Sequence, residues 1–213
     1  MSDLWPSLVR VRRHGGRPDV ILRALRGRDR AEWESLRAAN VGWLQPWEAS
    51  SPLAEQRLRY GQLVRHYDRE GRAGRAQPFV IETEGAIVGQ MHLTQIVWGS
   101  ARTGQAGYWV SREAAGQGIA TTALAALIDH AFLVLGMHRV AAYVQPENLP
   151  SLKVLNKLGF RDEGLGRNVL YVDGAWRDHR SFALTTEDVA GESVVRRWNA
   201  AQAHRAEASG GTP

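Results

Sequence analysis

The spacing of apolar residues changes several times along this chain, and each change marks a new predicted element. Apolar and polar residues alternate from Pro78 onward, which is the period of a half-buried strand. The turn-forming pair Glu84-Gly85 divides this stretch and predicts a hairpin. The strands expected here are Phe79–Glu82, Ile87–Val97 and, after a loop over 99–104, Gly107–Val110.

After Gly118 the apolar residues recur every three to four positions, the spacing of one helix face. We expect a helix over Gly118–Leu135 that ends before Gly136, because glycine suits the left-handed position that follows a helix. The elements expected next are a buried strand at Arg139–Val144 and a short helix between Asn148 and Gly159.

The N-terminal quarter carries strand patterns and then helix patterns. Apolar stretches on either side of His14-Gly15-Gly16 predict one or two strands, and Asp29 is a suitable N-cap for a helix. The expected strands are Val9–Arg13 and Val20–Leu25, and the first helix is Arg30–Ala39 with Trp33 and Leu36 on its inner face. A second helix is expected from a cap at Ser51, with Pro52 in its first turn, to about Arg69.

The C-terminal quarter begins with strands and ends in a polar stretch. The strands expected are Phe160–Gly164, Val169–Val172 and Trp176–Leu184, the last two joined by an Asp173-Gly174 turn. After Thr186 the sequence predicts a helix over Glu187–Trp198 and a flexible tail. The order of elements predicts an α+β fold with one domain at 1–186, which includes a basic N-terminal strand region, and a C-terminal helix and tail at 187–213.

The composition is that of an ordinary globular protein, with 44% hydrophobic and 23% charged residues in 213. The chain has no cysteine, which excludes disulfides, thiolate metal sites and a cysteine nucleophile, and we expect no metal. We find no apolar run long enough for a membrane span and no apolar signal core, so a cytoplasmic location is expected.

The net charge of +5 is concentrated at the N-terminal end. Residues 1–30 hold eight arginines against three aspartates, enough to account for the whole excess. A solvated basic edge explains this distribution, and a footprint for RNA is the alternative. Because no nucleic-acid motif accompanies the arginines, we expect nucleic-acid binding only as an incidental contact with ribosomal RNA.

The stretch Gly107–Phe132 combines a strand, a glycine turn and a helix, an arrangement that binds phosphate groups. Gly116 and Gly118 permit a tight turn, and the helix dipole presents its positive end there. The phosphate loop of nucleotide hydrolases is excluded, because no lysine follows the glycines. The dinucleotide fingerprint is excluded as well, because Thr121 occupies its third glycine position and the next strand ends at Val144-Gln145 without an acidic residue.

Several separated motifs resemble the GNAT superfamily of N-acetyltransferases, and within it the RimJ/RimL group. The turn Ala115–Ala120 is similar to that family's Q/R-x-x-G-x-G/A loop, with Ala115 in place of the first residue. The segments that are similar to the RimJ/RimL group are Trp43–Trp47, Asn148–Gly164, which carries the N-x-x-S and G-F-x-x-E-G patterns, and Val172–His179. Together the motifs cover about residues 20–185.

The resemblance implies a single domain with a mixed, mostly antiparallel sheet that is splayed at the cofactor site and has helices on both faces. It also implies that acetyl-CoA is the acyl donor. By the same resemblance, the N–H of Val110 is expected near the thioester carbonyl, where it would stabilise the developing oxyanion. The cofactor-binding residues implied are Val110, Arg112, Ala115, Gly116, Gln117, Gly118, Ile119, Ala120, Thr121, Asn148 and Ser151.

Catalytic roles are implied for Val110, Asn148 and Ser151, the serine as the group that protonates the leaving thiolate. Two of them have a plainer explanation: Asn148 is a suitable helix N-cap, and Ser151 is an ordinary polar residue of a first helical turn. The Trp43–Trp47 loop is either a packed connection or a lid over the acceptor, and the last hairpin, with Tyr171, Trp176 and Asp178, would form the opposite wall. Arg112 reaches the 3′-phosphate or faces solvent, and Tyr143 is more simply a strand aromatic.

The sequence leaves open which group acts as the general base. The glutamate that serves as base in RimL-like members aligns with Leu170, which accepts no proton. The candidates that remain are Glu82, His92, Glu113 and a water held by backbone groups; the two strand residues and the helix-start acid each have a plain structural explanation as well.

The acceptor is an amine. An α-amino group has a pKa about two to three units below that of lysine, so its deprotonation at neutral pH is easier by about 3–4 kcal/mol. The leading hypothesis is therefore the N-terminus of a protein, with a ribosomal protein starting in Ala or Ser implied by the resemblance. A small-molecule amine such as an aminoglycoside or polyamine is the alternative, as is a non-catalytic acyl-CoA sensor. We expect a monomer or homodimer with no membrane partner.

Overall fold

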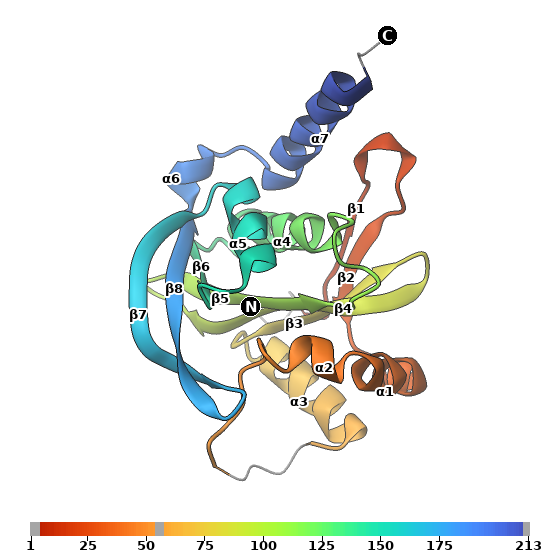
Figure 1. The fold of residues 1–213 in the computed structure, drawn as a ribbon, viewed down its shortest axis with the longest axis vertical. Coiled ribbons are helices and arrows are strands. Elements are labelled where there is room, and N and C mark those ends of the chain that lie inside the picture. The colour runs from red at the N-terminus through yellow and green to blue at the C-terminus, as the bar shows by residue number, and fades with distance from the viewer. Residues whose placement is uncertain (1–4, 54–57, 211–213) are drawn as a thin grey trace.

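The computed structural model describes residues 5–53 and 58–210, with side chains up to residue 207. The strands form a single eight-stranded sheet in the order β1-β2-β3-β4-β5-β6-β8-β7 (Figure 1). Their bounds are β1 Leu8–Val11, β2 Val20–Ala24, β3 Gln77–Thr83, β4 Ala86–Val97, β5 Thr103–Val110, β6 Arg139–Val144, β7 Arg161–Val172 and β8 Ala175–Thr185. All neighbouring strands are antiparallel except β5 and β6.

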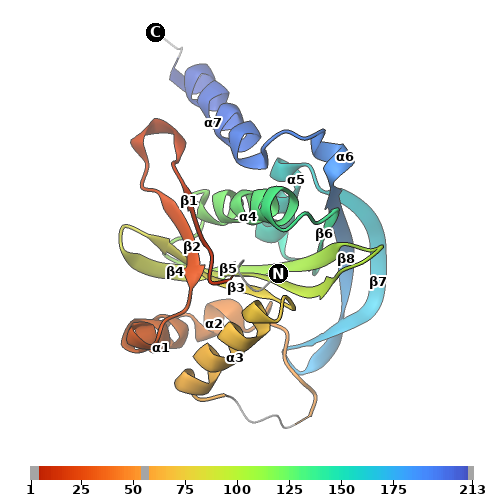
Figure 2. The same cartoon turned by 180° about the vertical axis from the view of Figure 1, so that it is seen from behind.

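Helices cover both faces of the sheet (Figures 1 and 2). The helices α4, α5 and α7 lie on one side of β3–β5, and α1, α2 and α3 lie on the other. Their bounds are α1 Arg30–Ala39, α2 Val41–Leu44, α3 Tyr60–Arg72, α4 Ile119–Asp129 with a π-helical extension over His130–Val134, α5 Leu149–Leu158, α6 Thr186–Val189 and α7 Val194–Gly210. The predicted α+β class and its mixed, mostly antiparallel sheet are confirmed.

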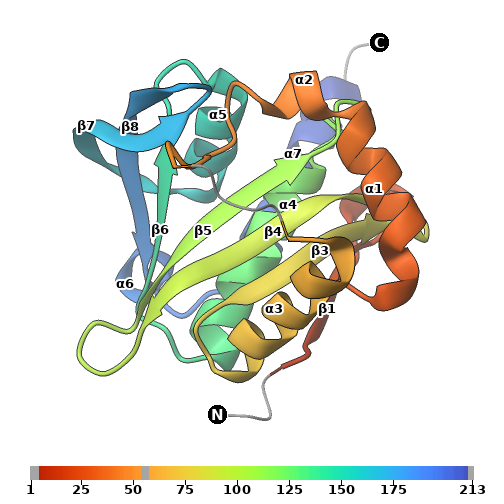
Figure 3. The same cartoon turned by 90° about the horizontal axis from the view of Figure 1, so that it is seen from below.

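The sheet splits between β5 and β6. The two strands pair in parallel only at one end, where Thr103–Gln105 faces Arg139–Ala141. Beyond that point β6 stays paired with β8 along its whole length, and β5 stays paired with β4. The two strands therefore diverge toward the end of β5, and Figure 3 shows the resulting V between them. The predicted splay is confirmed.

The helix α4 forms the centre of the main hydrophobic core. Every residue from Thr121 to Ile128 is buried, because the sheet packs on one side of this helix and α7 on the other. Trp198 of α7 is only 3% exposed and donates its indole N–H to Thr122 Oγ1 at 3.0 Å. The C-terminal helix thus packs onto the same core as the strands.

The opposite face of the sheet has its own smaller core, built from Leu25, Trp33, Tyr60, Val80 and Ile87. Beside it a buried guanidinium, Arg23, binds Asp29 at 2.7 Å and Glu82 at 2.5 Å. Removal of either carboxylate would leave a buried charge without its full set of partners, which is costly.

The starts of two helices and the cap of a third differ from the sequence prediction. The second helix begins at Tyr60, and not at Ser51, whose hydroxyl instead accepts the Leu53 N–H within a local turn. The start is fixed by Gln62, which bonds the Arg59 N–H, and by the burial of Tyr60; residues 54–57 of the predicted helix lie outside the described residues.

Asp29 precedes α1 as predicted, yet its carboxylate makes no capping bond to that helix. It accepts the Arg26 N–H and pairs with Arg23 instead, because the buried guanidinium captures it. The last helix begins at Val194 rather than Glu187, since Asp129 of α4 accepts the N–H groups of Val194 and Val195 at its first turn. The helix also continues to Gly210, past its predicted end at Trp198 and into the predicted flexible end at 208–213, of which residues 211–213 lie outside the described residues.

Over the described ranges, none of the helices is both long enough and apolar enough to pass through a membrane.

A single methyl group at Gly89 is expected to destabilise the protein. A Cβ there would overlap the carbonyl oxygen of Trp109 and lie 2.9 Å from Val110 Cα, and backbone atoms cannot move aside. We expect Gly89→Ala to lower the free energy of unfolding by about 1–3 kcal/mol. Gly27→Ala is the control, because no atom lies within 4 Å of its Cβ position. Equal unfolding midpoints for the two variants in urea would contradict the prediction.

Candidate functional site at the splayed strands

The backbone of Val110 points into the gap between β5 and β6. The Ser111 N–H donates to the Val88 carbonyl at 2.8 Å, and Val110 faces Gly89 across the β4–β5 ladder. Because hydrogen-bonded and non-hydrogen-bonded pairs alternate along antiparallel strands, the N–H and C=O of Val110 point away from β4 and toward β6. An extended ligand in the gap therefore meets polar backbone groups, as a neighbouring strand would.

The glycine turn follows directly and presents free amides. Gly116 and Gly118 adopt φ of 76° and 77°, the left-handed region that glycine favours. The N–H groups of residues 116–120 have no acceptor among the described residues, whereas the Ala115 N–H is already bonded to the Arg112 carbonyl. Since these free donors lie at the positive end of α4, the turn is suited to bind an anion such as a diphosphate.

Among the predicted contacts of this turn, the backbone donors are well placed and the side chains less so. The Gln117 amide turns back to the Glu113 carbonyl at 2.7 Å, away from a ligand on the turn. Ile119 and Thr121 are buried. A ligand here would be held mainly by main-chain N–H groups.

The first turn of α5 forms the other wall. Asn148 is its N-cap, with Oδ1 accepting the Ser151 N–H at 3.1 Å. The Ser151 hydroxyl lies 2.9 Å from the Tyr108 hydroxyl, which comes from β5 on the other side of the gap. Burial raises the pKa of Tyr108 to about 12, so the phenol stays neutral and acts as a fixed hydrogen-bonding group.

The segment 40–50, which includes α2, spans the open end of the gap (Figure 3). Trp43 Nε1 donates to the Val110 carbonyl at 3.1 Å, and Gln145 at the end of β6 donates to the Pro46 carbonyl at 2.9 Å. Farther along, Gln45 bonds Asp173 at 2.8 Å, and Ala49 pairs with Val172 of the β7–β8 hairpin. The segment is thus attached to both strands of the gap and to the last hairpin.

Asn40 fixes the next residues of β5. Its Oδ1 accepts the Arg112 N–H at 2.9 Å, and the Arg112 guanidinium lies 6.0 Å from the Trp43 ring centre. The Arg112 N–H, predicted to bind a ligand, therefore has a protein partner in this structure. Asn40 and Tyr108 were not among the predicted site residues, whereas Trp43 belongs to the loop that was predicted as either a packed connection or a lid.

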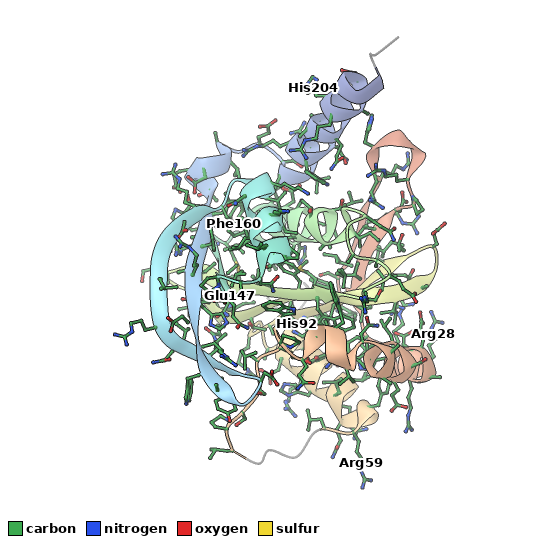
Figure 4. All side chains as sticks on the ribbon, in the orientation of Figure 1. Arg28, Arg59, His92, Glu147, Phe160 and His204 are labelled. Atoms are coloured by element: carbon green, nitrogen blue, oxygen red, sulfur yellow. The ribbon has the colours of Figure 1, made fainter. Side chains whose placement is uncertain are left out.

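The three candidate bases lie in different environments. Glu82 is paired with the buried Arg23, which makes it a structural ion pair away from the gap. Glu113 is exposed in the turn before α4. His92 lies on the face of the sheet toward α1–α3, with its ring 5.2 Å from that of Tyr67 and its Nε2 without a partner among the described residues (Figure 4). Leu170, in β7 opposite Arg177, supplies no acceptor for a proton.

The arrangement can hold a long, phosphorylated ligand in an extended form. Its anionic part would lie on residues 116–120, and its far end would lie between the Val110 N–H on the β5 side and the Ser151 hydroxyl, which Tyr108 of β5 contacts. A carbonyl at that point would receive a hydrogen bond as negative charge develops on its oxygen, and Ser151 could protonate a leaving group.

Comparison with known proteins identifies relatives with named activities. A family model described as an acetyltransferase (GNAT) domain matches residues 19–161. The solved structure of Mycobacterium smegmatis RimJ in complex with CoA-disulfide is similar with a TM-score of 0.84 and 39% identity, covering 93% of this chain and 96% of that one.

Two curated proteins extend this picture. The ribosomal protein uS5-alanine N-acetyltransferase of Escherichia coli is 30% identical over 179 residues, which cover 79% of this chain and 89% of that protein. The probable N-acetyltransferase YjcK of Bacillus subtilis is 37% identical over 106 residues, and the match spans 50% of this chain and 59% of that protein's length.

His92 is expected to make folding stability depend on pH. Burial lowers the pKa of its imidazole to about 4, whereas an unfolded histidine titrates near 6.5. The unfolded chain therefore binds a proton that the folded chain excludes, so the stabilisation is present above about pH 6.5 and is lost as the pH falls toward 4. Between pH 6.5 and 4 we expect the free energy of unfolding to fall by about 2–3 kcal/mol less in His92→Gln than in the wild type.

The exposed His204 supplies the control for this measurement (Figure 4). The free energy of unfolding is measured in urea at several pH values for the wild type, His92→Gln and His204→Gln. The comparison is between the slopes of this free energy against pH and not between the absolute stabilities. A slope for His92→Gln equal to that of wild type would show that His92 does not resist protonation.

Proposed function

The chain belongs to the GNAT acetyltransferases and is an N-acetyltransferase, and from this we propose that it acetylates the N-terminal α-amino group of a protein, with acetyl-CoA as donor. We further propose a ribosomal protein that starts with Ala or Ser as the acceptor. The observation that carries the proposal is the V between β5 and β6, with the Val110 N–H on its β5 side near the open end and the free amides of residues 116–120 shortly after that strand.

Acetyl-CoA fits this site in one direction. Its diphosphate is anionic and suits the amides of the glycine turn, and its pantetheine arm carries amides that pair with an open strand edge such as β5. The thioester then lies near Val110. The solved relative that holds a CoA-disulfide, M. smegmatis RimJ, supports coenzyme A as the ligand.

The reaction needs three contributions from this chain. A neutral amine attacks the thioester carbon, a C–N bond forms and the C–S bond breaks. The Val110 N–H stabilises the negative charge on the carbonyl oxygen. Ser151 donates a proton to the departing sulfur, while Tyr108 holds the serine hydroxyl in position and Asn148 fixes its backbone.

The environment of the attacking amine favours an α-amino acceptor over lysine. No carboxylate stands at Leu170, and Glu82 is ion-paired with Arg23, so neither position supplies a free carboxylate base to the gap. An α-amino group, with a pKa near 7.7–8.0, is already partly neutral at pH 7.5, and water suffices to take its proton. A lysine acceptor would need deprotonation across roughly three pH units.

The walls of the acceptor site come from segment 40–50 and the β7–β8 hairpin. Their bonds at Gln45–Asp173 and Ala49–Val172 hold them together across the mouth of the gap. The named activity of the E. coli relative, an alanine N-acetyltransferase acting on ribosomal protein uS5, supports a protein acceptor that starts with alanine.

Thiol release from acetyl-CoA tests the function. We expect turnover with peptides that start with Ala or Ser and none with the same peptides after N-terminal blocking. Turnover with spermidine or an aminoglycoside, and not with peptides, would reassign the acceptor. Tight binding of acetyl-CoA without turnover on any amine would favour a sensor.

A double-mutant cycle tests the roles of Ser151 and Tyr108. We expect Ser151→Ala to lower kcat by roughly 10²-fold or more with little change in the KM for acetyl-CoA, because a general acid contributes about 10²–10⁴-fold. Tyr108→Phe keeps the packing and removes the hydroxyl, and should lower kcat by roughly tenfold.

The cycle also separates a positioning role from a structural one. If Tyr108 acts through Ser151, Tyr108→Phe lowers kcat in the wild type and has no effect in the Ser151→Ala background. Multiplicative effects of the two changes, or matching losses in melting temperature, would make Tyr108 a packing residue only.

A further inference from the structure

The β1–β2 connection and α7 enclose a second cavity beside the glycine turn. Its volume is about 160 Å³, and its lining includes Arg13, Arg17, Thr122, Trp198 and Gln202. Arg13 and Arg17 come from the connection, Thr122 from the first turn of α4, and the other two from α7. The family model covers 19–161 only, so both outer walls lie outside the region that defines the family.

The walls are held in place by hydrogen bonds. Trp198 Nε1 bonds Thr122 Oγ1 at 3.0 Å, which fixes α7 on the start of α4. Asn199 Nδ2 donates to the Arg12 carbonyl at 3.0 Å, which ties α7 to the β1–β2 connection. The cavity is therefore formed before any ligand enters, and little conformational freedom is lost on binding.

Arg13 contacts the glycine turn itself. Its guanidinium donates to the Gln117 carbonyl, and Nη2 lies 3.5 Å from the position of a Gly118 Cβ. Trp198 lies 3.7 Å from the same position. A ligand on the free amides of this turn consequently continues directly into the space between the arginines and α7.

The two arginines carry charge without a counter-ion. Burial and the neighbouring charge of Arg17 both lower the pKa of Arg13. Neither guanidinium forms an ion pair with a carboxylate in the part of the chain that the structure describes, although other arginines of the N-terminal region, such as Arg10 and Arg23, do. Two adjacent unpaired positive charges on a formed cavity favour an anionic ligand.

We propose that Arg13 and Arg17 bind the ribose 3′-phosphate of coenzyme A. The proposal rests on the proposed function, since it places the diphosphate of the coenzyme on residues 116–120. The 3′-phosphate is one ribose away from the diphosphate, and Arg13 and Trp198, which line the cavity, both lie within 3.7 Å of the Gly118 Cβ position. A phosphate monoester carries about −1.5 to −2 charges at pH 7, and guanidinium groups bind it through paired N–H donors.

The test compares coenzyme A with 3′-dephospho-coenzyme A by isothermal titration calorimetry. We expect the wild type to bind coenzyme A roughly tenfold or more tightly than the dephospho form, and Arg17→Ala to remove most of this preference while leaving the affinity for the dephospho form unchanged. Arg28→Ala, which removes an equally exposed arginine far from the cavity, is the matched control and should keep the full preference (Figure 4).

Each possible result shows whether Arg13 and Arg17 bind the 3′-phosphate. Equal affinity of the wild type for both ligands, or an Arg17→Ala variant that behaves like Arg28→Ala, overturns the proposal while coenzyme binding itself stands. Arg13→Ala should act like Arg17→Ala; if it weakens both ligands equally, Arg13 serves the diphosphate and is removed from the assignment. No binding of either ligand to the wild type would reject the proposed function and the inference with it.

Discussion

The architecture depends on a competition for one strand edge. The strand β6 has two possible neighbours, and β8 pairs with it along all six residues while β5 keeps only three. The backbone groups of β5 that face β6 beyond Gln105 are thereby left without a partner strand, a situation that buried β-strands normally avoid. This open edge is where we propose that the acetyl donor binds, and the glycine turn and α5 are the two segments that follow the diverging strands.

Elements with a strong period were predicted from the sequence almost to the residue. The hairpin about Glu84-Gly85, the strand at Arg139–Val144 and the helix before Gly159 all depend on local patterning, and local patterning survives folding. The start of the second helix was wrong, because a cap such as Ser51 is a weak local signal beside the burial of Tyr60. The same holds for Asp29, whose carboxylate is taken by the buried Arg23.

The glycine turn before α4 was predictable because glycines and a helix start leave a motif, whereas the contacts around the gap leave none. Trp43 and Val110 are 67 residues apart, and Tyr108 and Ser151 are 43 apart. No periodicity or spacing links such pairs; they are set by which strand lies beside which helix. The proposed acceptor side is built almost entirely from contacts of this kind, along segment 40–50 and the last hairpin.

The bond between Asn199 and the Arg12 carbonyl joins positions 187 residues apart, close to the two ends of the chain. A chain that emerges from the ribosome N-terminus first exposes the β1–β2 connection early, while α7 is among the last segments to be released. The central sheet and α4 have all their residues available before that moment. The outer wall of the cavity beside the glycine turn is therefore complete only after synthesis ends, so the coenzyme binding that we propose there belongs to the finished chain and not to the nascent one.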